Sequence, residues 1–175
     1  MEANGHRFVQ RLISAYDLAY RPSKMNIRQA ALSDAPVVAE FNLRLAEETE
    51  QLRLVLEVVR AGVAAVLSNP AKGIYFVAEA EGAVVGQLMI TYEWSDWRNG
   101  NFWWIQSVYV KPEFRGQGVF HTLFKHLEGL ARSTPEVAGL RLYMHAENHR
   151  ARRTYEQLGM KHSNYEVFET DFVLG

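Results

Sequence analysis

The sequence contains no cysteine among its 175 residues. Disulfide bonds, thiolate catalysis and zinc sites with cysteine ligands are therefore excluded, and this composition is compatible with a reducing, cytoplasmic location. We expect neither a membrane span nor a signal peptide, because no apolar run is long enough and the pattern of a leader is missing. The formal net charge is only −1, so no global field favours a nucleic acid or an anionic membrane as a partner.

The composition is that of a globular protein, since 48% of the residues are hydrophobic. The length suffices for one domain with a proper core. A domain-like start appears at Met25. We therefore expect a single domain over residues 25–175, preceded by an extension at residues 1–24 that is either a short extra helix or the product of a start assigned too early.

Periodicity and turn residues predict alternating strands and helices. Ser33 is a capping residue with Pro36 in the first turn of a helix, and Glu81-Gly82 is typical of a hairpin turn. Gly86, inside a strand pattern, predicts a bulge. The expected strands are 27–30, 74–80, 83–92, 102–110 and 140–145, with a closing antiparallel pair at 160–163 and 165–172; the expected helices are 33–47, 54–67, 116–133 and 148–159. This order predicts an α/β fold around a central sheet.

A strand, a glycine turn and a helix follow one another between Val108 and Phe124. Pro112 ends the strand, and Arg115-Gly116-Gln117-Gly118 precedes the helical pattern. The first N–H groups of a helix have no partner within the helix, and glycines allow a ligand to approach the backbone. The stretch therefore predicts an anion site, although two glycines at a helix start are also compatible with a simple tight turn.

Common nucleotide-binding fingerprints do not fit this stretch. The third glycine of the dinucleotide motif is replaced by His121, and the Gly-Lys-Ser/Thr of the P-loop is absent. The stretch instead resembles the acetyl-CoA loop of the GCN5-related N-acetyltransferases, the GNAT superfamily, whose pattern is Arg/Gln-x-x-Gly-x-Gly/Ala. Arg115 and Gly118 match that pattern, while Phe120 replaces the final small residue.

A second motif lies in the predicted helix 148–159. Asn148, Ala151, Tyr155 and Gly159 match the GNAT C-terminal pattern Asn-x-x-Ala-x-x-x-Tyr-x-x-x-Gly-Phe at every spacing, with Met160 in place of Phe. Without the upstream loop, Asn148 is explained by helix capping and Tyr155 by core packing. Together the two motifs extend the resemblance over residues 25–172, and it implies a mixed, mostly antiparallel central sheet flanked by helices.

The resemblance implies direct attack of an amine on the thioester of acetyl-CoA. Tyr155 matches the family's acid for the leaving thiolate, and a strand backbone N–H around Val108–Val110 matches the donor to the oxyanion. Gln106 stands where many relatives place a carboxylate, and it could only hold a water molecule. The implied cofactor-binding residues are Val108, Tyr109, Val110, Arg115, Gly116, Gln117, Gly118, Val119, Phe120, Asn148 and Arg150.

The general base and the acceptor stay open at this level. Carboxylates or histidines that could serve as the base are Glu47, Glu48, Glu93, Asp96, His145 and Glu147. No metal site is expected, because the histidines lack the spacing of a ligand pair. Trp94 and Trp97 with the acidic turn at Glu47-Glu48 predict a pocket for a small cationic amine, although hairpin packing and a solvated acidic run explain the same residues.

Two functions are compatible with these patterns. The first is an acetyl-CoA-dependent N-acetyltransferase acting on a primary amine. The second is a non-catalytic acyl-CoA-binding or regulatory module of the same fold, which the missing strand carboxylate and Phe120 favour and Tyr155 disfavours. Neither pattern indicates a nucleic acid or membrane partner, and a homodimer is left open.

Overall fold

The computed structural model describes residues 25–173, so the expected extension at residues 1–24 lies outside the described part. The chain divides into two compact units, and the boundary between them in the sequence falls between Leu142 and Tyr143. Each unit is described by itself.

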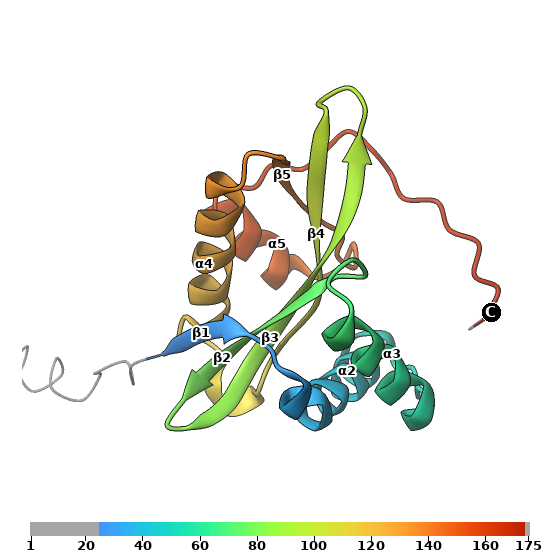
Figure 1. The fold of residues 1–175 in the computed structure, drawn as a ribbon, viewed down its shortest axis with the longest axis vertical. Coiled ribbons are helices and arrows are strands. Elements are labelled where there is room, and N and C mark those ends of the chain that lie inside the picture. Colours follow the sequence, from blue (N-terminus) through green and yellow to red (C-terminus); the bar gives the residue numbers. More distant parts are fainter. Residues whose placement is uncertain (1–24, 174–175) are drawn as a thin grey trace, which may run out of the picture. The chain divides into compact units, whose positions relative to one another are not determined.

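The first unit is built on one five-stranded sheet in the order β1-β2-β3-β4-β5 (Figure 1). The first four strands pair antiparallel, and β5 pairs parallel to β4. The sheet is therefore mixed and mostly antiparallel, as expected. Its strands are β1 (Asn26–Gln29), β2 (Ile74–Ala80), β3 (Ala83–Ser95), β4 (Gly100–Val110) and β5 (Val137–Leu142).

Helices cover both faces of this sheet (Figure 1). They are α2 (Ala35–Glu50), α3 (Leu56–Ser68) and α4 (Val119–Ser133), with short 3₁₀ turns η1 (Leu32–Asp34) and η2 (Pro112–Phe114). Tyr75 and Phe76 are neighbours in β2 and point to opposite faces, as strand geometry requires. Tyr75 packs in the core with α2 and α3, whereas the Phe76 ring lies 5.7 Å from that of His126 in α4.

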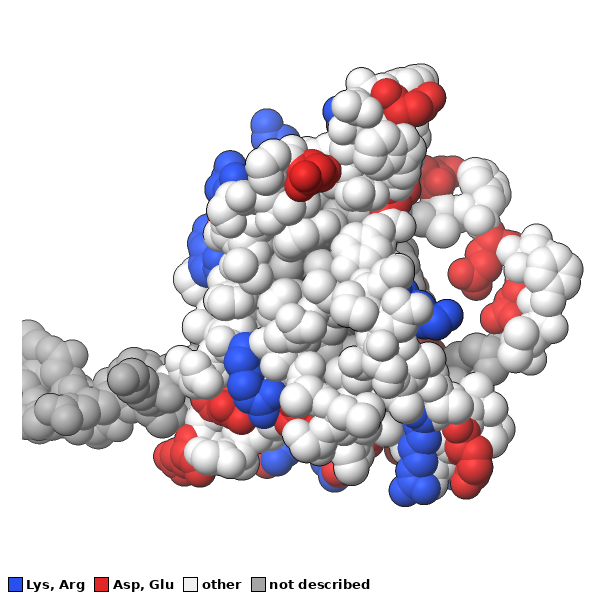
Figure 2. Space-filling model, in the orientation of Figure 1, with Lys and Arg blue, Asp and Glu red and all other residues white. Residues whose placement is uncertain are grey.

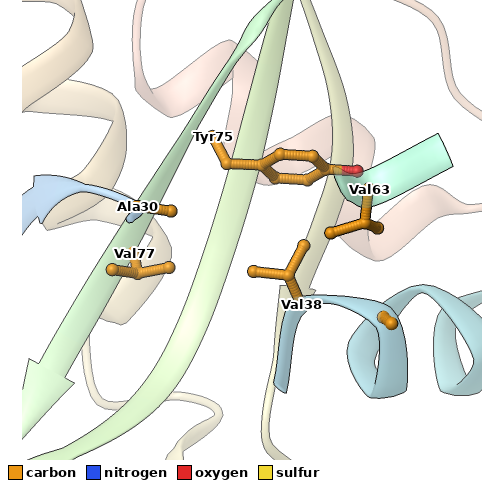
Figure 3. Packing of buried hydrophobic residues seen from close by; sticks show 6 residues of the cluster. Ala30, Val38, Val63, Tyr75 and Val77 are labelled. Carbon is orange, nitrogen blue, oxygen red and sulfur yellow. The ribbon is translucent and has the colours of Figure 1, made fainter. Parts of the chain in front are cut away.

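The core beneath α2 and α3 is aliphatic around one tyrosine. Val38, Val63 and Val77 are 0–2% exposed, and Figure 3 shows the Tyr75 ring lying among these side chains. Among the described residues, no helix is both long and apolar enough to span a bilayer.

The second unit contains α5 (His149–Gln157). The Oδ1 atom of Asn148 accepts a hydrogen bond from the N–H of Ala151 at 3.0 Å, which confirms the predicted cap. The predicted closing pair at 160–163 and 165–172 is wrong, because the structure has no strand in residues 160–173. Alternation alone does not make a strand; backbone groups need a partner edge, and the aromatic side chains Phe168 and Phe172 are 90% and 92% exposed.

Two further boundaries differ from expectation near the tip of β3 and β4. The predicted loop 93–101 is shorter, because Trp94 pairs with Asn101 and Ser95 with Gly100. Asn99 adopts a left-handed conformation with φ 47° and closes the turn without a glycine at that position. The last strand begins at Val137 instead of Leu140, because Val137 already pairs with Asn101.

A charge cluster joins the first strand to the rest of the unit. Arg28 donates to both carboxylate oxygens of Asp34, at 2.7 and 2.9 Å, and to Glu79 at 2.7 and 2.9 Å. Asp34 is 7% exposed. The hydrogen bonds from Arg28 outweigh desolvation and hold the pKa of Asp34 below its ordinary value.

Removing the cation of this cluster should destabilise the fold in a pH-dependent way. Because the folded-state pKa of Asp34 is lowered, its carboxylate stabilises the wild type above pH ~4, and this contribution is lost as the pH falls through the lowered value. Arg28→Met leaves a buried, unpaired carboxylate. We expect a loss of roughly 2 kcal/mol at pH 7, below the ~3–5 kcal/mol of a fully buried pair because Arg28 is one-third exposed.

The measurement is urea unfolding at pH 7, 5 and 4, with Arg132→Met as the matched control in an exposed pair. The deficit of Arg28→Met should shrink toward acid pH as Asp34 takes up a proton. A deficit that is constant with pH, or no larger than that of Arg132→Met, contradicts this account.

Candidate active site

The pairing between strands β4 and β5 ends in the middle of β4. Their pairing runs from Asn101–Val137 to Ile105–Leu142, whereas β4 continues to Val110. Just beyond the last pair, Ser107 and Val108 together oppose the single residue Leu88 of β3, which is a β-bulge. Ser107 has φ 50°, an uncommon conformation for a residue other than glycine and one that clusters at functional sites. The bulge predicted at Gly86 is found beside that residue, where the β2–β3 register shifts.

The loop after β4 leads directly into the N-terminus of α4. Gly116 and Gly118 have φ 77° and 79°, and a Cβ atom at either position would meet no heavy atom within 4 Å. The first helical hydrogen bond runs from the N–H of Thr122 to the carbonyl of Gly118 at 2.9 Å. The N–H groups of residues 119–121 therefore lie in the first turn, where the helix itself supplies no acceptor and its dipole is positive. This arrangement suits a phosphate-bearing ligand.

The side chain of Arg115 is held beside this turn by α2. Its Nη2 atom donates to the Oε2 of Glu48 at 2.6 Å, and its Nε atom donates to the carbonyl of Val110 at 2.8 Å. Glu48 also accepts a hydrogen bond from the hydroxyl of Tyr109 at 2.9 Å. Desolvation works against the charge of Glu48, but the bonds from Arg115 and Tyr109 keep its pKa below the ordinary value.

Tyr109 is buried at the centre of this group. Its ring packs 5.0 Å from that of Phe41 and lies under the Arg115 guanidinium at 5.3 Å. Desolvation, and then its bond to Glu48, raise the pKa of the Tyr109 hydroxyl. The structure thus brings together Glu48, expected for the acceptor, with Arg115 and Tyr109, expected for the cofactor.

The other predicted residues of the first unit are spread over the sheet and its edges. Gln106 donates to the Thr91 hydroxyl at 2.7 Å, and Gln117 donates to the carbonyl of Glu113 at 2.7 Å. Val119 is buried, and the ring of Phe120 lies 6.1 Å from that of Phe124.

Predicted acceptor residues lie at two separate places. Glu47 lines a hollow of about 280 Å³ at the end of α2, together with Leu43, Leu52, Arg53 and Leu54. The second place is the β3–β4 tip: Trp94 lies near the C-terminal end of β3 and Trp97 in the turn that follows. Their side chains are 58% and 83% exposed. Trp94 also alternates with Glu93 along β3, so the two side chains point to opposite faces of the sheet.

Glu93 is the most constrained of the predicted base candidates. It accepts hydrogen bonds from the indole N–H of Trp104 and from the guanidinium of Arg141. That guanidinium also lies 3.8 Å from the centre of the Phe102 ring. Both oxygens of this carboxylate are therefore occupied by donors. Asp96 accepts from the N–H of Trp97 at 2.9 Å and so serves the turn.

In the second unit, Tyr155 lies on α5 and burial raises the pKa of its hydroxyl. Arg150 lies five residues earlier and is exposed, as is Glu147. His145 accepts, through Nδ1, a hydrogen bond of 3.4 Å from the N–H of Glu147. Within residues 25–173, no group of three or more histidine, aspartate or glutamate side chains could hold a metal ion.

Sequence reasoning missed the bulge at Ser107 and the side chain that supports it, Gln87. A usable signal existed for Gln87, because it is the only polar side chain in the otherwise apolar run 84–90. No signal marked Ser107, since serine gives no sign of a left-handed conformation.

Figure 2 shows basic and acidic side chains interspersed over a mostly uncharged surface, in keeping with the small net charge.

Comparison with known proteins agrees with this geometry. The family model described as "Acetyltransferase (GNAT) family" matches residues 38–160. The chain is 30% identical over 148 residues to a thialysine N-ε-acetyltransferase from Bos taurus, covering 76% of this chain and 82% of that protein.

Two solved structures are similar in fold. A possible acetyltransferase from Clostridium difficile 630 has a TM-score of 0.80 and 44% identity, covering 85% of this chain and 98% of that one. A predicted acetyltransferase with acetyl-CoA from Clostridium acetobutylicum has a TM-score of 0.69 at 17% identity, covering 85% and 97%.

The contact between α2 and the loop can be tested without any ligand. Glu48 and Arg115 are each more than one-third exposed, so a double-mutant cycle of Glu48→Gln and Arg115→Met should give a coupling of only about 0.2–1 kcal/mol in unfolding free energy. The coupling should decrease when the ionic strength is raised from about 0.05 M to about 0.5 M. A coupling of zero at low salt would show that the two side chains do not interact in solution.

Proposed function

Because the chain belongs to the acetyltransferase (GNAT) family, we propose that it transfers the acetyl group of acetyl-CoA to the primary amine of a small cationic acceptor by direct attack. The observation that carries the proposal is the glycine turn at the start of α4. It offers first-turn N–H groups and open space immediately after the strand that leaves its neighbour.

Residues of this turn supply the proposed site for the cofactor phosphates. The N–H groups of residues 116–120 bind the pyrophosphate, and Arg115 adds a cation next to them. Arg115 is proposed to turn from Glu48 to a phosphate when acetyl-CoA binds. Asn148 and Arg150 are further proposed cofactor-binding residues, as the family resemblance implies.

Tyr155 is the proposed acid for the departing thiolate. A raised pKa keeps its hydroxyl protonated at neutral pH, which is the form that donates a proton. After the amine has attacked the carbonyl carbon, the C–S bond breaks, the phenol proton passes to sulfur, and free CoA leaves. Tyr155 is then reprotonated from solvent.

A water molecule on Gln106 is proposed to remove the proton of the acceptor ammonium. Gln106 donates a hydrogen bond to the Thr91 hydroxyl. Because its amide is uncharged, Gln106 is not itself the base, and its proposed role is to orient the water. Glu93 is not assigned this role because its two oxygens are already occupied by donors.

Two separate places are proposed for the acceptor: the carboxylates at the end of α2, and the tryptophans of the β3–β4 tip. Glu47 borders a hollow, Glu48 is released when Arg115 turns to a phosphate, and Trp94 and Trp97 offer exposed rings to a cation. The similarity to an enzyme named for the ε-amine of thialysine supports a small amine. The alternative, a non-catalytic acyl-CoA-binding module, is favoured by the neutral Gln106 and is distinguished by turnover.

Replacing Tyr155 by phenylalanine tests the chemistry. The ring and its packing are kept, so binding of acetyl-CoA should be unchanged, while the turnover number should fall roughly 10²–10⁴-fold. Release of free thiol with a panel of small amines measures turnover, and calorimetric titration measures binding. If a folded Tyr155→Phe protein keeps near-wild-type turnover, the acid is not Tyr155; if the wild type turns over no amine, the binding module is the better description.

Trp97→Ala tests the acceptor pocket. Loss of the ring should raise KM for the best cationic amine about 2- to 5-fold, which corresponds to the ~0.5–1 kcal/mol of cation–π attraction at an exposed ring, and should leave the affinity for acetyl-CoA unchanged. Val58→Ala, which removes an exposed apolar side chain from α3, is the control. Equal weakening of both substrates, or a best acceptor that is anionic, is incompatible with the pocket.

A further inference from the structure

One fully buried polar side chain links four elements of the first unit. Gln87 of β3 is 0% exposed. Its Nε2 atom donates to Oδ1 of Asn42 in α2 at 2.7 Å and to the carbonyl of Ser107 in β4 at 3.3 Å. Asn42 in turn donates through Nδ2 to the hydroxyl oxygen of Tyr75 in β2 at 2.9 Å. The carbonyl that Gln87 holds belongs to the strained residue of the bulge.

The bulge peptide faces two ways. The carbonyl of Ser107 and the N–H of Val108 belong to the same planar unit, which is trans because the described chain contains no cis peptide. In a trans peptide these two groups point in opposite directions. With its carbonyl turned to the side chain of Gln87, this peptide directs the Val108 N–H away from that side chain, at a level of β4 where pairing with β5 has already ended at Ile105–Leu142.

A contribution to folding stability does not explain why Gln87 holds this peptide. The Oε1 atom of Gln87 is buried and has no hydrogen-bond partner among the described residues. A buried acceptor without a partner is unfavourable compared with an apolar side chain of the same size. Ser107 adds a second unfavourable feature, since a left-handed conformation persists outside glycine only when its surroundings fix it. Two local costs at one peptide indicate that its orientation is needed.

We propose that Gln87 and Asn42 are positioning residues that aim the Val108 N–H at the carbonyl oxygen of the acetyl thioester. Asn42 fixes the position of the Gln87 amide, and that amide fixes the direction of the Ser107 carbonyl. Because the peptide is planar, the direction of the carbonyl also sets the direction of the Val108 N–H. That N–H then stabilises the negative charge that develops on the thioester oxygen when the amine attacks. The inference rests on the proposed function and adds to it the two side chains that prepare the donor before the substrate arrives.

The test compares a ligand that has the carbonyl with one that lacks it. Gln87→Met keeps the shape of the side chain and removes its donor. Acetyl-CoA and CoA share every contact except those of the acetyl group, so the ratio of their dissociation constants reports the carbonyl contact. In Gln87→Met the preference for acetyl-CoA over CoA should fall severalfold, and the affinity for CoA should stay within about twofold. Turnover should drop roughly 10- to 100-fold, less than the ~10²–10³-fold loss seen when an oxyanion donor is removed outright.

A spectroscopic readout accompanies the titrations. The carbonyl ¹³C resonance of acetyl-CoA labelled at C1 of the acetyl group should shift downfield on binding to the wild type and shift less on binding to Gln87→Met, because the hydrogen bond polarises the carbonyl. Asn42→Leu, which leaves the bond between Gln87 and Ser107 in place, should give a smaller change in the same direction. It also provides a second variant if Gln87→Met does not fold.

Val63→Ala is the matched control for a general loss of stability. Val63 is 2% exposed in the core between α3 and the sheet and makes none of these hydrogen bonds. It should lower the unfolding midpoint and change neither the ligand preference nor the turnover.

The inference is overturned if folded Gln87→Met retains the wild-type preference for acetyl-CoA, or if it loses affinity for both ligands equally. If the wild type binds acetyl-CoA and transfers its acetyl group, and Gln87→Met has the same ligand preference and turnover, only this inference is contradicted. A wild type that binds neither ligand contradicts the proposed function as well.

Discussion

The site depends on the point at which β4 loses its neighbour. Up to Ile105, β4 is hydrogen-bonded on both sides, to β3 and to β5. Beyond that residue it keeps only β3, so a sheet interior becomes a sheet edge. Backbone polar groups that lie away from solvent need partners, so an edge of this kind is suited to receive a ligand that supplies them. The bulge at Ser107 lies at this transition.

The second constraint is the short path from that edge to a helix start. Residues 111–118 separate the end of β4 from α4, so the edge and the first-turn N–H groups belong to one continuous stretch of chain. The edge suits a neutral acyl group and the helix start suits phosphates. Glu48 connects this stretch to α2, because it accepts bonds from both Tyr109 and Arg115. The proposed cofactor and acceptor sites therefore share one carboxylate.

Much of this arrangement could be predicted from the sequence, for physical reasons that differ by element. The apolar stripe of α4, with Leu123, Phe124 and Leu127 buried, follows directly from helical periodicity. The cap at Asn148 and the positive φ at Gly118 are local properties that residue type indicates. The mostly antiparallel pairing of the central sheet also agrees with the expected family fold.

The parts that could not be predicted are those set by tertiary context. Residues 165–172 have strand-forming side chains but no partner strand in the structure, and partner edges are not encoded locally. The contact between Glu48 and Arg115 joins residues 67 positions apart, and nothing in either sequence neighbourhood indicates it. Gln87 was visible as a polar residue in an apolar run, but its role depends on the conformation of Ser107 in another strand.

Binding of acetyl-CoA tests the central claim most directly. Calorimetric titration would compare the wild type with Gly118→Glu, which places a side chain and a negative charge in the open space at the start of α4. Two controls are matched to it. Gly129→Glu adds the same charge farther along the same helix, also in open space; Gly118→Asn adds a side chain that tolerates the left-handed conformation without a charge. We predict that folded Gly118→Glu loses at least about tenfold in affinity, while Gly129→Glu binds like the wild type and Gly118→Asn lies between them. Unchanged affinity in a folded Gly118→Glu protein would contradict the assignment of this turn to the cofactor.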